Sequence, residues 1–386
     1  MQYADSLAAI MAFTRASWIP GFLMMRARLF ATVLLTVVAA AGAKAKEDTT
    51  STRKRSGYVF IPALYYTPET ESAGGAVVMF YFRPKSSPDD VKPSTITPTL
   101  IFTQREQVIV DLGASIYFDD GRYWLTAGVS FQRYPDKFWG IGPDTNEEAE
   151  EDFTPRTFAV GGTLRRSLRE GLSVGASYEF SNDEITEVQE DGDLATGMVD
   201  GSAGAVVSGV GLAVSWDTRD NTFYATRGSF HQASVRWFGS ALGSDYDYVA
   251  FNADVRKYVA LGPRTVLALQ GVYAGVDGTA PFRLLPQFGG PSLVRGYWAG
   301  RYRDNHTAVG QVDLRVKIGW HVGAIAFGSV GNVAPRLDAF RSETIRATGG
   351  FGVRYFFNET EGVSARADFA FGGNAMGPYI YINEAF

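Results

Sequence analysis

The sequence of 386 residues contains no cysteine and only three histidines. The absence of cysteine excludes disulfides, thiolate metal ligands, cysteine nucleophiles and a lipid-modified N-terminal cysteine. Three histidines leave little material for a zinc site, and a net charge of −5 gives no basic surface of the kind that nucleic acid requires. We therefore expect no metal, no other cofactor and no nucleic-acid partner.

Long hydrophobic runs are also missing beyond residue 45, so a spanning helix of about twenty apolar residues cannot form there. Aromatic residues, in contrast, reach 14% of the chain, and there are 43 glycines. This composition is typical of amphipathic strands, which present one apolar and one polar face. If this part of the chain crosses a bilayer, it must do so with strands.

The N-terminal region has the pattern of an export signal. Arg26 and Arg28 precede residues 29–41, which are apolar apart from two threonines, and Ala43-Lys44-Ala45 has the small-residue form of a cleavage site. A basic segment, a short apolar run and such a site together indicate a secretory signal peptide. We predict three regions: 1–45, an upstream extension plus a cleaved signal; 46–56, a short polar linker; and 57–386, a β-barrel.

The remaining sequence alternates between apolar and polar residues. Between Ala308 and Val322, one parity is apolar or glycine, and the other contains Gln311, Asp313 and Arg315. Side chains of a strand alternate between its two faces, so charged residues at successive inward positions indicate a polar lumen. We predict sixteen antiparallel strands: 58–66, 73–82, 95–103, 107–117, 122–133, 156–168, 171–181, 205–217, 227–239, 246–260, 264–275, 306–319, 321–331, 345–357, 362–371 and 378–386.

The lengths of the connections support an even number of strands. Three long connections, near 134–155, 182–204 and 276–305, all follow odd-numbered strands, whereas most connections after even-numbered strands are tight. Long external loops and short periplasmic turns are the usual asymmetry of outer-membrane barrels. The connection at 83–94 is an exception. The pattern predicts a transmembrane β-barrel in the outer membrane of a Gram-negative bacterium.

One loop motif is more specific than the strand pattern. Residues 288–297 read Phe-Gly-Gly-Pro-Ser-Leu-Val-Arg-Gly-Tyr, and they are followed by Arg301 and Arg303. This segment resembles the loop between the eleventh and twelfth strands of BamA/TamA family proteins, in the bacterial surface antigen superfamily. The resemblance implies that the loop folds back into the lumen. Its motif positions here are Val294, Arg295, Gly296 and Tyr297.

Other segments resemble the same family. Residues 216–221, which include Asp217, Arg219 and Asp220, look like its turn between the eighth and ninth strands, and residues 66–70 look like its first turn. Residues 138–142 add to the resemblance, which covers nearly all of 57–386. The final residue, Phe386, is similar to the C-terminal aromatic by which the barrel assembly machinery recognises such proteins.

The resemblance also suggests a partner for the arginine of the loop. A buried arginine needs a carboxylate, and Asp313 lies on the inward parity of the twelfth strand, where relatives carry an acid. We therefore predict an Arg295–Asp313 pair. Relatives often add a second acid where this chain has Ser329, so we expect one usual partner to be unfilled. Arg295 either only fastens the loop to the wall or takes part in gating or substrate passage.

The function suggested by this family is the translocation or insertion of protein or lipid. Residues 44–56 are too few for a periplasmic POTRA domain, so the chain resembles barrel-only members, with a separately encoded periplasmic partner as one possibility. Outer-membrane lipids and lipopolysaccharide are the expected surroundings. The alternatives are a passive pore or structural surface antigen and, less favoured, an outer-membrane lipase. His231 and Ser234 differ in parity, which argues against a lipase, and we predict no enzyme.

Overall fold

The computed structural model describes residues 56–83, 93–358 and 362–386. The predicted signal peptide, the upstream extension and residues 46–55 of the linker lie outside these residues, as does most of the connection at 83–94. Within the described residues, no helix is long and apolar enough to cross a bilayer.

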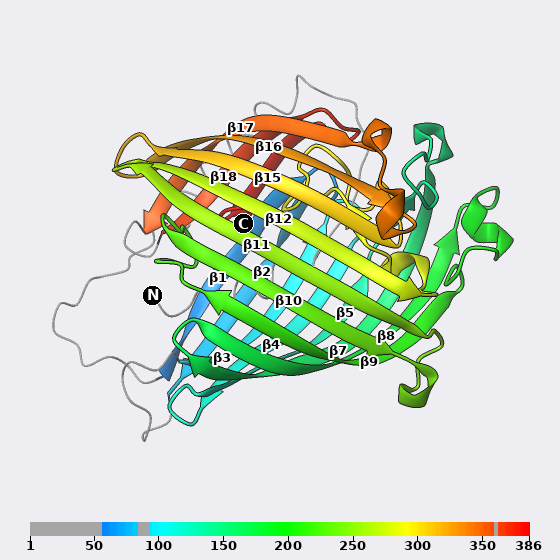
Figure 1. Cartoon of the computed structure of the whole chain (residues 1–386), viewed down its shortest axis with the longest axis horizontal. Helices are drawn as coiled ribbons and strands as arrows, with labels where there is room; N and C mark the ends of the chain where they lie inside the picture. The colour runs from blue at the N-terminus through cyan, green and yellow to red at the C-terminus, as the bar shows by residue number, and fades with distance from the viewer. Residues whose placement is uncertain (1–55, 84–92, 359–361) are drawn as a thin grey trace.

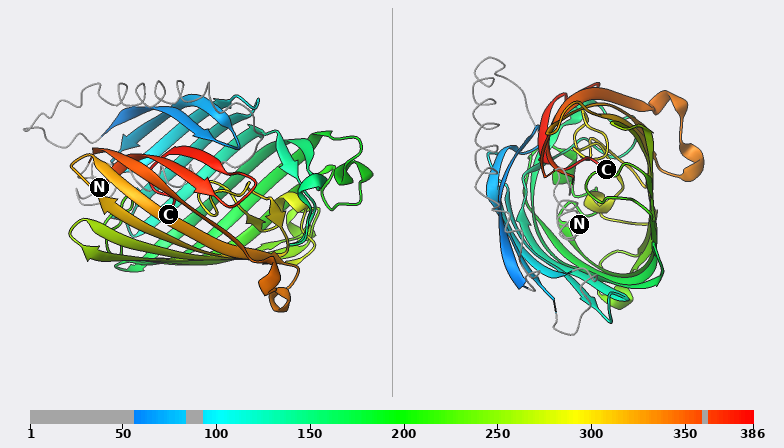
Figure 2. Two further views of the ribbon diagram at one scale, coloured as in Figure 1. Left: turned by 90° about the horizontal axis from the view of Figure 1, so that it is seen from above. Right: turned by 90° about the vertical axis from the view of Figure 1, so that its left-hand side faces the viewer.

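Sixteen antiparallel strands form a closed barrel in the described part of the chain, as predicted (Figures 1 and 2). Each strand pairs with its neighbours in sequence, and the first pairs with the last. The strands are β1 Ser56–Thr67, β2 Glu71–Phe82, β3 Ser94–Thr103, β4 Val108–Phe118, β5 Tyr123–Arg133, β7 Glu151–Arg169, β8 Leu172–Val188, β9 Gly204–Asp217, β10 Gly228–Phe238, β11 Tyr248–Gly262, β12 Thr265–Gly278, β15 His306–Lys317, β16 Val322–Ala334, β17 Arg346–Asn358, β18 Val363–Phe371 and β19 Gly377–Ile382.

The smaller elements lie in the connections. The short strand β6 (Asp136–Phe138) continues the sheet beside β7, and β13 (Gln287–Phe288) pairs with β14 (Tyr302–Arg303). Six single 3-10 turns complete the described elements: η1 Glu147–Ala149, η2 Asp193–Thr196, η3 Ser240–Leu242, η4 Phe282–Leu284, η5 Leu337–Ala339 and η6 Ser342–Thr344.

The alternation in the sequence separates the two faces of the wall. On β15, Val312 and Leu314 are each 39% exposed, whereas Asp313 between them is 0% exposed. Successive side chains of a strand point to opposite faces, so the apolar residues face outward and the charged ones face the lumen. The hydrophobic surface of this protein is therefore mostly on its outside.

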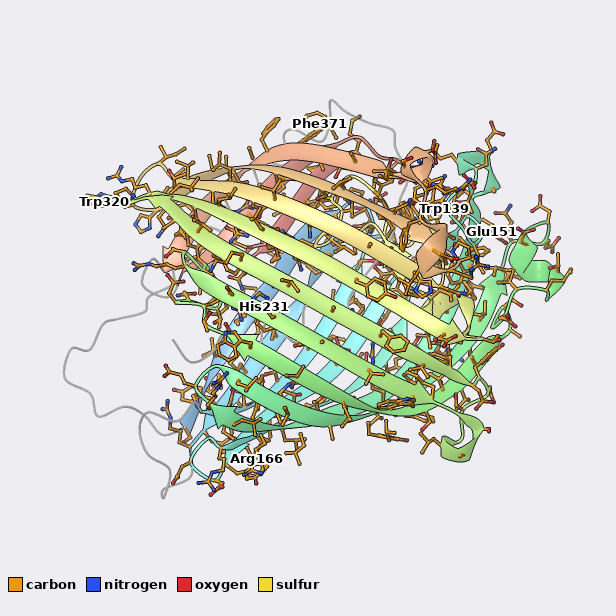
Figure 3. All side chains as sticks on the ribbon, viewed as in Figure 1. Trp139, Glu151, Arg166, His231, Trp320 and Phe371 are labelled. Carbon is orange, nitrogen blue, oxygen red and sulfur yellow. The ribbon has the colours of Figure 1, made fainter. Side chains whose placement is uncertain are left out.

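The two ends of the barrel differ. One end, the turn end, carries short connections such as 170–171 and 318–321, and the other, the loop end, carries long ones such as 279–305. Figure 3 labels Trp320 at the turn end and Trp139 at the loop end. The barrel thus has the asymmetry predicted from the connection lengths.

Strands β7 and β8 extend farther toward the loop end than the predicted strands 156–168 and 171–181. Residues 182–188 fall in the predicted connection 182–204, but they belong to β8. In the structure, Arg156 on β7 pairs with Glu184 at 3.1 Å, and Arg133 on β5 pairs with Glu187 at 3.1 Å. Cross-strand ion pairs therefore accompany strand pairing beyond the apolar band.

The junction between β1 and β19, which we call the seam, is the shortest pairing in the barrel. It has one pair of register partners, Tyr66 and Ile380, within the described residues. The neighbouring junctions have twelve pairs (β1 with β2) and six pairs (β18 with β19). Fewer ladder hydrogen bonds hold the wall together here than elsewhere.

The last strand ends at Ile382, so the predicted strand 378–386 is wrong for its last four residues. Asn383 has a φ of 66°, in the left-handed region, and this turns the chain away from the sheet. Its backbone N–H donates to Ser364 at 2.7 Å. Figure 2 places the C-terminus inside the ring of strands.

Candidate functional site

The loop between β12 and β15, residues 279–305, lies inside the barrel (Figure 2, yellow). Its short β13–β14 hairpin is part of a cluster of buried apolar residues from the loop and from the inner wall of β15 and β16. The cluster consists of Phe288, Leu293, Val294, Tyr302, Val309 and Val333. Apolar contact therefore fixes the loop against one part of the wall, and this places the arginine motif.

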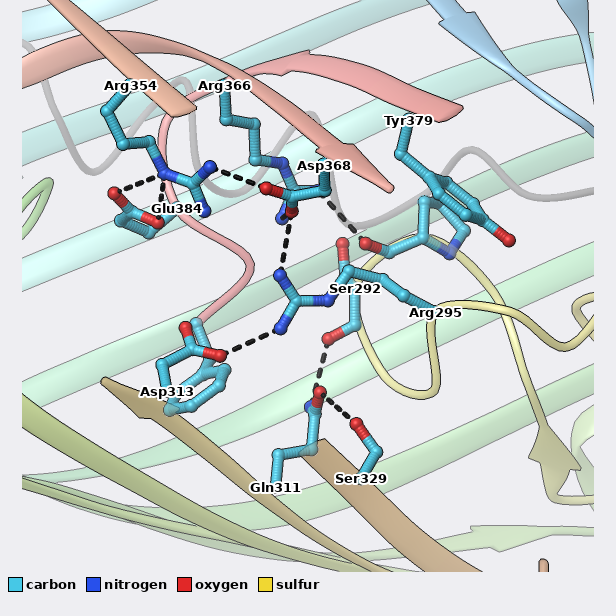
Figure 4. Close-up of polar contacts among 12 residues, drawn as sticks. Ser292, Arg295, Gln311, Asp313, Ser329, Arg354, Arg366, Asp368, Tyr379 and Glu384 are labelled. Atoms are coloured by element: carbon cyan, nitrogen blue, oxygen red, sulfur yellow. Dashed lines mark hydrogen bonds and ion pairs between the residues drawn. The ribbon is translucent and has the colours of Figure 1, made fainter. Parts of the chain in front are cut away.

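Arg295 is completely buried and lies between two carboxylates (Figure 4). One terminal nitrogen is 2.8 Å from Asp313 on β15, and the other is 2.7 Å from Asp368 on β18. The guanidinium carbon lies 3.6 Å from the centre of the Phe327 ring. The planar fork of arginine can bond two acceptors while its face contacts an aromatic ring, which lysine could not do.

The predicted pair of Arg295 and Asp313 is thus in contact, but Asp368 was not foreseen as a partner. We expected Ser329 to leave one acidic position unfilled. Asp368 supplies the second carboxylate from a different strand, while the Ser329 hydroxyl donates to Gln311 at 3.2 Å. The Gln311 amide in turn donates to the backbone oxygen of Ser292 at 3.0 Å. Ser329 therefore supports the loop indirectly, through a neutral hydrogen-bond chain.

Gly296 allows the loop backbone to approach the last strands closely. Its φ is 104°, which a residue with a side chain adopts only with strain. Its N–H donates to the hydroxyl of Tyr379 on β19 at 3.0 Å, and that hydroxyl donates to Ala375 at 2.9 Å. A Cβ added at Gly373 would come within 2.1 Å of the Gly296 oxygen. Backbone contact therefore joins the loop to the β18–β19 connection.

The ion pairs continue beyond Arg295. Arg315 on β15 bonds Asp313 at 2.9 Å, and Arg354 on β17 bonds Asp368 at 2.5 Å. Arg354 also bonds Glu384 at 2.9 Å. All these side chains are nearly or fully buried, and a buried charge that loses its partner costs several kcal/mol. Asp313 and Asp368 therefore each bind more than one arginine, Arg354 links Asp368 to Glu384, and the network is continuous.

The C-terminal residues belong to this network. The main-chain oxygen of Phe386 accepts from Arg315 at 2.9 Å, and the guanidinium lies 5.2 Å from the Phe386 ring centre. The ring is buried in a cluster with Tyr258 on β11, Ala268 on β12 and Ala225 in the connection between β9 and β10. Phe386 is thus placed inside the lumen, while its role as an assembly signal stays a prediction.

Arg301 and Arg303 lie apart from Arg295, near the loop end. Arg301 bonds the side chain and backbone of Thr145 at 2.9 and 3.0 Å, and burial lowers its pKa. Arg303 is 1% exposed and bonds backbone oxygens, including that of Lys137 at 3.4 Å. Burial lowers its pKa to about 10. These two arginines fasten the lumen loop to the connection at 134–150, at the loop end of the barrel.

The other predicted motifs are found at both ends of the barrel. At the turn end, Arg219 bonds Asp217 at 2.7 Å, and Asp220 accepts from the backbone of Thr226 at 2.9 Å. Desolvation raises the pKa of Asp220, but the hydrogen bonds from Thr226 and Arg227 together outweigh it and hold that pKa below its ordinary value. At the loop end, Glu69 in the first turn accepts from the N–H of Ala299 at 3.3 Å.

The lumen loop consequently contacts both sides of the seam. Glu69 follows β1 on one side, and Tyr379 belongs to β19 on the other. Sequence reasoning missed Asp368, Arg354 and Glu384, although the alternation of residues 362–371 placed Asp368 on a polar face. The alternation predicted the face of the strand on which Asp368 lies, but it could not predict that Arg295 is its partner.

Comparison with known proteins agrees with this architecture. Residues 101–374 match the Omp85 superfamily domain, so the chain belongs to the Omp85 superfamily. No curated protein sequence matches the chain significantly.

Solved structures with the same fold include BamA from Haemophilus ducreyi lacking POTRA domains 1-3, with a TM-score of 0.62 and 12% identity over 92% of this chain and 78% of that one. CdiB from Acinetobacter baumannii gives a TM-score of 0.55 and 11% identity over 87% of this chain and 60% of that one. CdiB from Escherichia coli gives a TM-score of 0.57 and 10% identity over 86% of this chain and 63% of that one. The chain spans less than two thirds of each CdiB chain.

Proposed function

We propose that this Omp85 superfamily barrel works in a Gram-negative outer membrane and moves or inserts polypeptide or lipid by opening at its seam. The observation that carries the proposal is the weak junction between β1 and β19, with one register pair bridged by the lumen loop. Opening this junction breaks fewer ladder hydrogen bonds than opening any neighbouring one. The loop then acts as the latch, with Arg295 as its charged anchor.

A passive pore is the alternative, and the geometry at the lumen supports it less. Both carboxylates that hold Arg295 are buried, and the loop occupies the inside of the ring. A lipase is supported less still. His231 pairs with Trp216 on β9, and Ser234 pairs with Ala213, so the two side chains face opposite sides of the wall.

A disulfide across the seam tests the proposal. The chain has no cysteine, so Tyr66→Cys with Ile380→Cys introduces a single defined pair at directly opposed positions. We expect the protein in lipid vesicles to accelerate the insertion of an unfolded eight-stranded outer-membrane barrel. Oxidation of the seam pair should abolish the acceleration, and reduction should restore it.

The matched control places the disulfide between β12 and β15, at the opposed residues Leu267 and Leu314. Oxidised Leu267→Cys with Leu314→Cys should insert the substrate as fast as the wild type. Equal acceleration by the oxidised seam variant would show that the seam does not open. No acceleration by the wild type, together with a large steady conductance, would support the passive pore instead.

A further inference from the structure

Lys257 is a lipid-facing cation on the outer wall of β11. Its neighbours on the same face of the strand, Val255 and Val259, are 50% and 37% exposed. Among the described residues, its ammonium contacts the hydroxyl of Ser229 on β10 at 3.3 Å and lies within ion-pair distance of no carboxylate. The arginine beside it in sequence, Arg256, faces the lumen and has Asp254 as its partner at 2.5 Å.

An unpaired lysine is unfavourable on this face. On the outside of a membrane barrel, a lysine is most unfavourable at the bilayer centre, and the cost falls toward the interface. The apolar residues Val259 and Leu261, the latter 59% exposed, lie between Lys257 and the end of the strand. The lysine thus lies within the apolar band, where an anion next to its ammonium would offset the cost.

An apolar groove begins beside this lysine. It has a volume of about 620 Å³ and is lined by Lys257 together with outward-facing Gly271, Gly310 and Gly328, on β12, β15 and β16. Gly271 and Gly310 are opposed in the sheet, and a Cβ added at Gly271 would meet no atom within 4 Å. Missing side chains on adjacent strands therefore leave a hollow in the wall, on strands that lie side by side (Figure 1).

The walls of the groove determine what it can hold. Four exposed apolar side chains flank it: Val255, Leu269, Val312 and Val330. The backbone of its floor is already paired within the β11–β12–β15–β16 ladders, so it offers no hydrogen bonds to an added peptide strand. The groove therefore offers mainly dispersion contacts to an occupant, and a hydrocarbon chain needs no other kind of contact.

We propose that this groove and Lys257 form a binding site for an anionic phospholipid. The phosphate binds the Lys257 ammonium beside the Ser229 hydroxyl, and an acyl chain fills the hollow over Gly271 and Gly310. The volume falls within the roughly 300–1,000 Å³ of small-molecule sites. The site requires only that the barrel lie in a bilayer, and it does not depend on opening of the seam.

Native mass spectrometry of the purified full chain tests the site. The delipidated protein is incubated in micelles with equal amounts of phosphatidylglycerol, which is anionic, and phosphatidylethanolamine, which is zwitterionic. The wild type should retain phosphatidylglycerol preferentially. Lys257→Gln should weaken that retention about tenfold, because a charge-assisted hydrogen bond is lost. Gly271→Leu, which fills the groove, should reduce the retention of both lipids.

The matched control is Arg166→Gln. Arg166 is another exposed cation near the turn end, on β7, and it lies 5.9 Å from the ring of Tyr123, away from the groove. This variant should retain lipid like the wild type, and the heat-dependent gel migration of each variant checks that its barrel is folded. The proposal would be overturned if Lys257→Gln retained as much phosphatidylglycerol as the wild type. It would also be overturned if Arg166→Gln lost as much of this lipid as Lys257→Gln does. If the wild type bound no lipid but formed a dimer, and Gly271→Leu abolished that dimer, the groove would be assigned to a second copy of the chain.

Discussion

At the scale of single residues, Arg295 is held in the lumen by contacts from three strands. It has no exposed surface and contacts two carboxylates and an aromatic ring, each from a different strand. Removing such a buried group is strongly destabilising, because its partners then stay charged and buried. The arginine therefore ties the loop to β15, β16 and β18 together.

Replacing this arginine should destabilise the barrel. We expect Arg295→Ala to lower the free energy of unfolding by about 3–5 kcal/mol, because Asp313 and Asp368 lose a shared cation. Urea titration of the refolded protein in micelles measures the change. Arg336→Ala, which removes an exposed pair with Asp338 in the β16–β17 connection, serves as the control and should change little. Equal stabilities for the two variants would contradict the importance of the buried clamp.

At the scale of elements, the turn between β9 and β10 is held by its own side chains. Asp220 accepts backbone hydrogen bonds from Thr226 and Arg227 at 2.9 and 3.2 Å, which closes the turn. Tyr224 in the same turn packs against Phe356 on β17, with ring centres 5.1 Å apart. A turn predicted from its motif thus also reaches across the turn end of the barrel.

The pKa of Asp220 gives this turn a pH dependence. The folded-state pKa lies below its ordinary value, so the carboxylate contributes stability above the unfolded pKa and loses it as the pH falls through the folded pKa. Asp220→Asn should therefore lower the free energy of unfolding by about 1 kcal/mol or less at pH 7, because the group is largely exposed. At pH 3 the substitution should lower it by a smaller amount, because the wild-type carboxylate has then lost part of its contribution. The urea midpoint at the two pH values measures this.

Asp120→Asn, in the exposed turn between β4 and β5, is the comparison for that measurement. Among the described residues, the Asp120 carboxylate accepts no hydrogen bond like those that close the Asp220 turn, so Asp120→Asn should change the free energy of unfolding little. A cost for Asp220→Asn that grows on acidification would show that the carboxylate does not hold the turn.

At the scale of the whole molecule, parts of the chain lie in the lumen near both ends of the barrel. The lumen loop is fastened to the 134–150 connection at the loop end by Arg301 and Arg303, and Phe386 lies inside the turn end. We therefore expect small, flickering conductance in a planar bilayer. Deleting residues 291–299 should give a larger and steadier conductance, because the clamp and its loop are removed together.

Single-channel recording separates this expectation from a passive pore. Arg295→Ala should have an intermediate effect, with longer openings than the wild type, because the loop remains but its anchor is lost. Deletion of the β16–β17 connection at 337–344, outside the lumen loop, is the control and should leave the conductance unchanged. A large, steady wild-type conductance would overturn the view of an obstructed lumen.

Much of this architecture follows from the sequence alone. The alternation of residues 308–322 and of similar segments predicted sixteen strands, and the structure confirms that number for the described residues. The loop motif around Arg295 indicated the family and the loop position. Both are local properties, because the period of a strand and the residues of a turn are set by chain geometry within a few positions.

The tertiary structure decided which of these residues meet. Asp368, not Ser329, completes the carboxylate pair, and Glu384 draws the chain end into the lumen instead of extending β19. The outward glycines of β12, β15 and β16 also form one groove only because their strands are aligned in register. Alternation fixes the face on which a side chain lies, but closure of the barrel fixes its neighbours across the lumen, and that depends on all strands together.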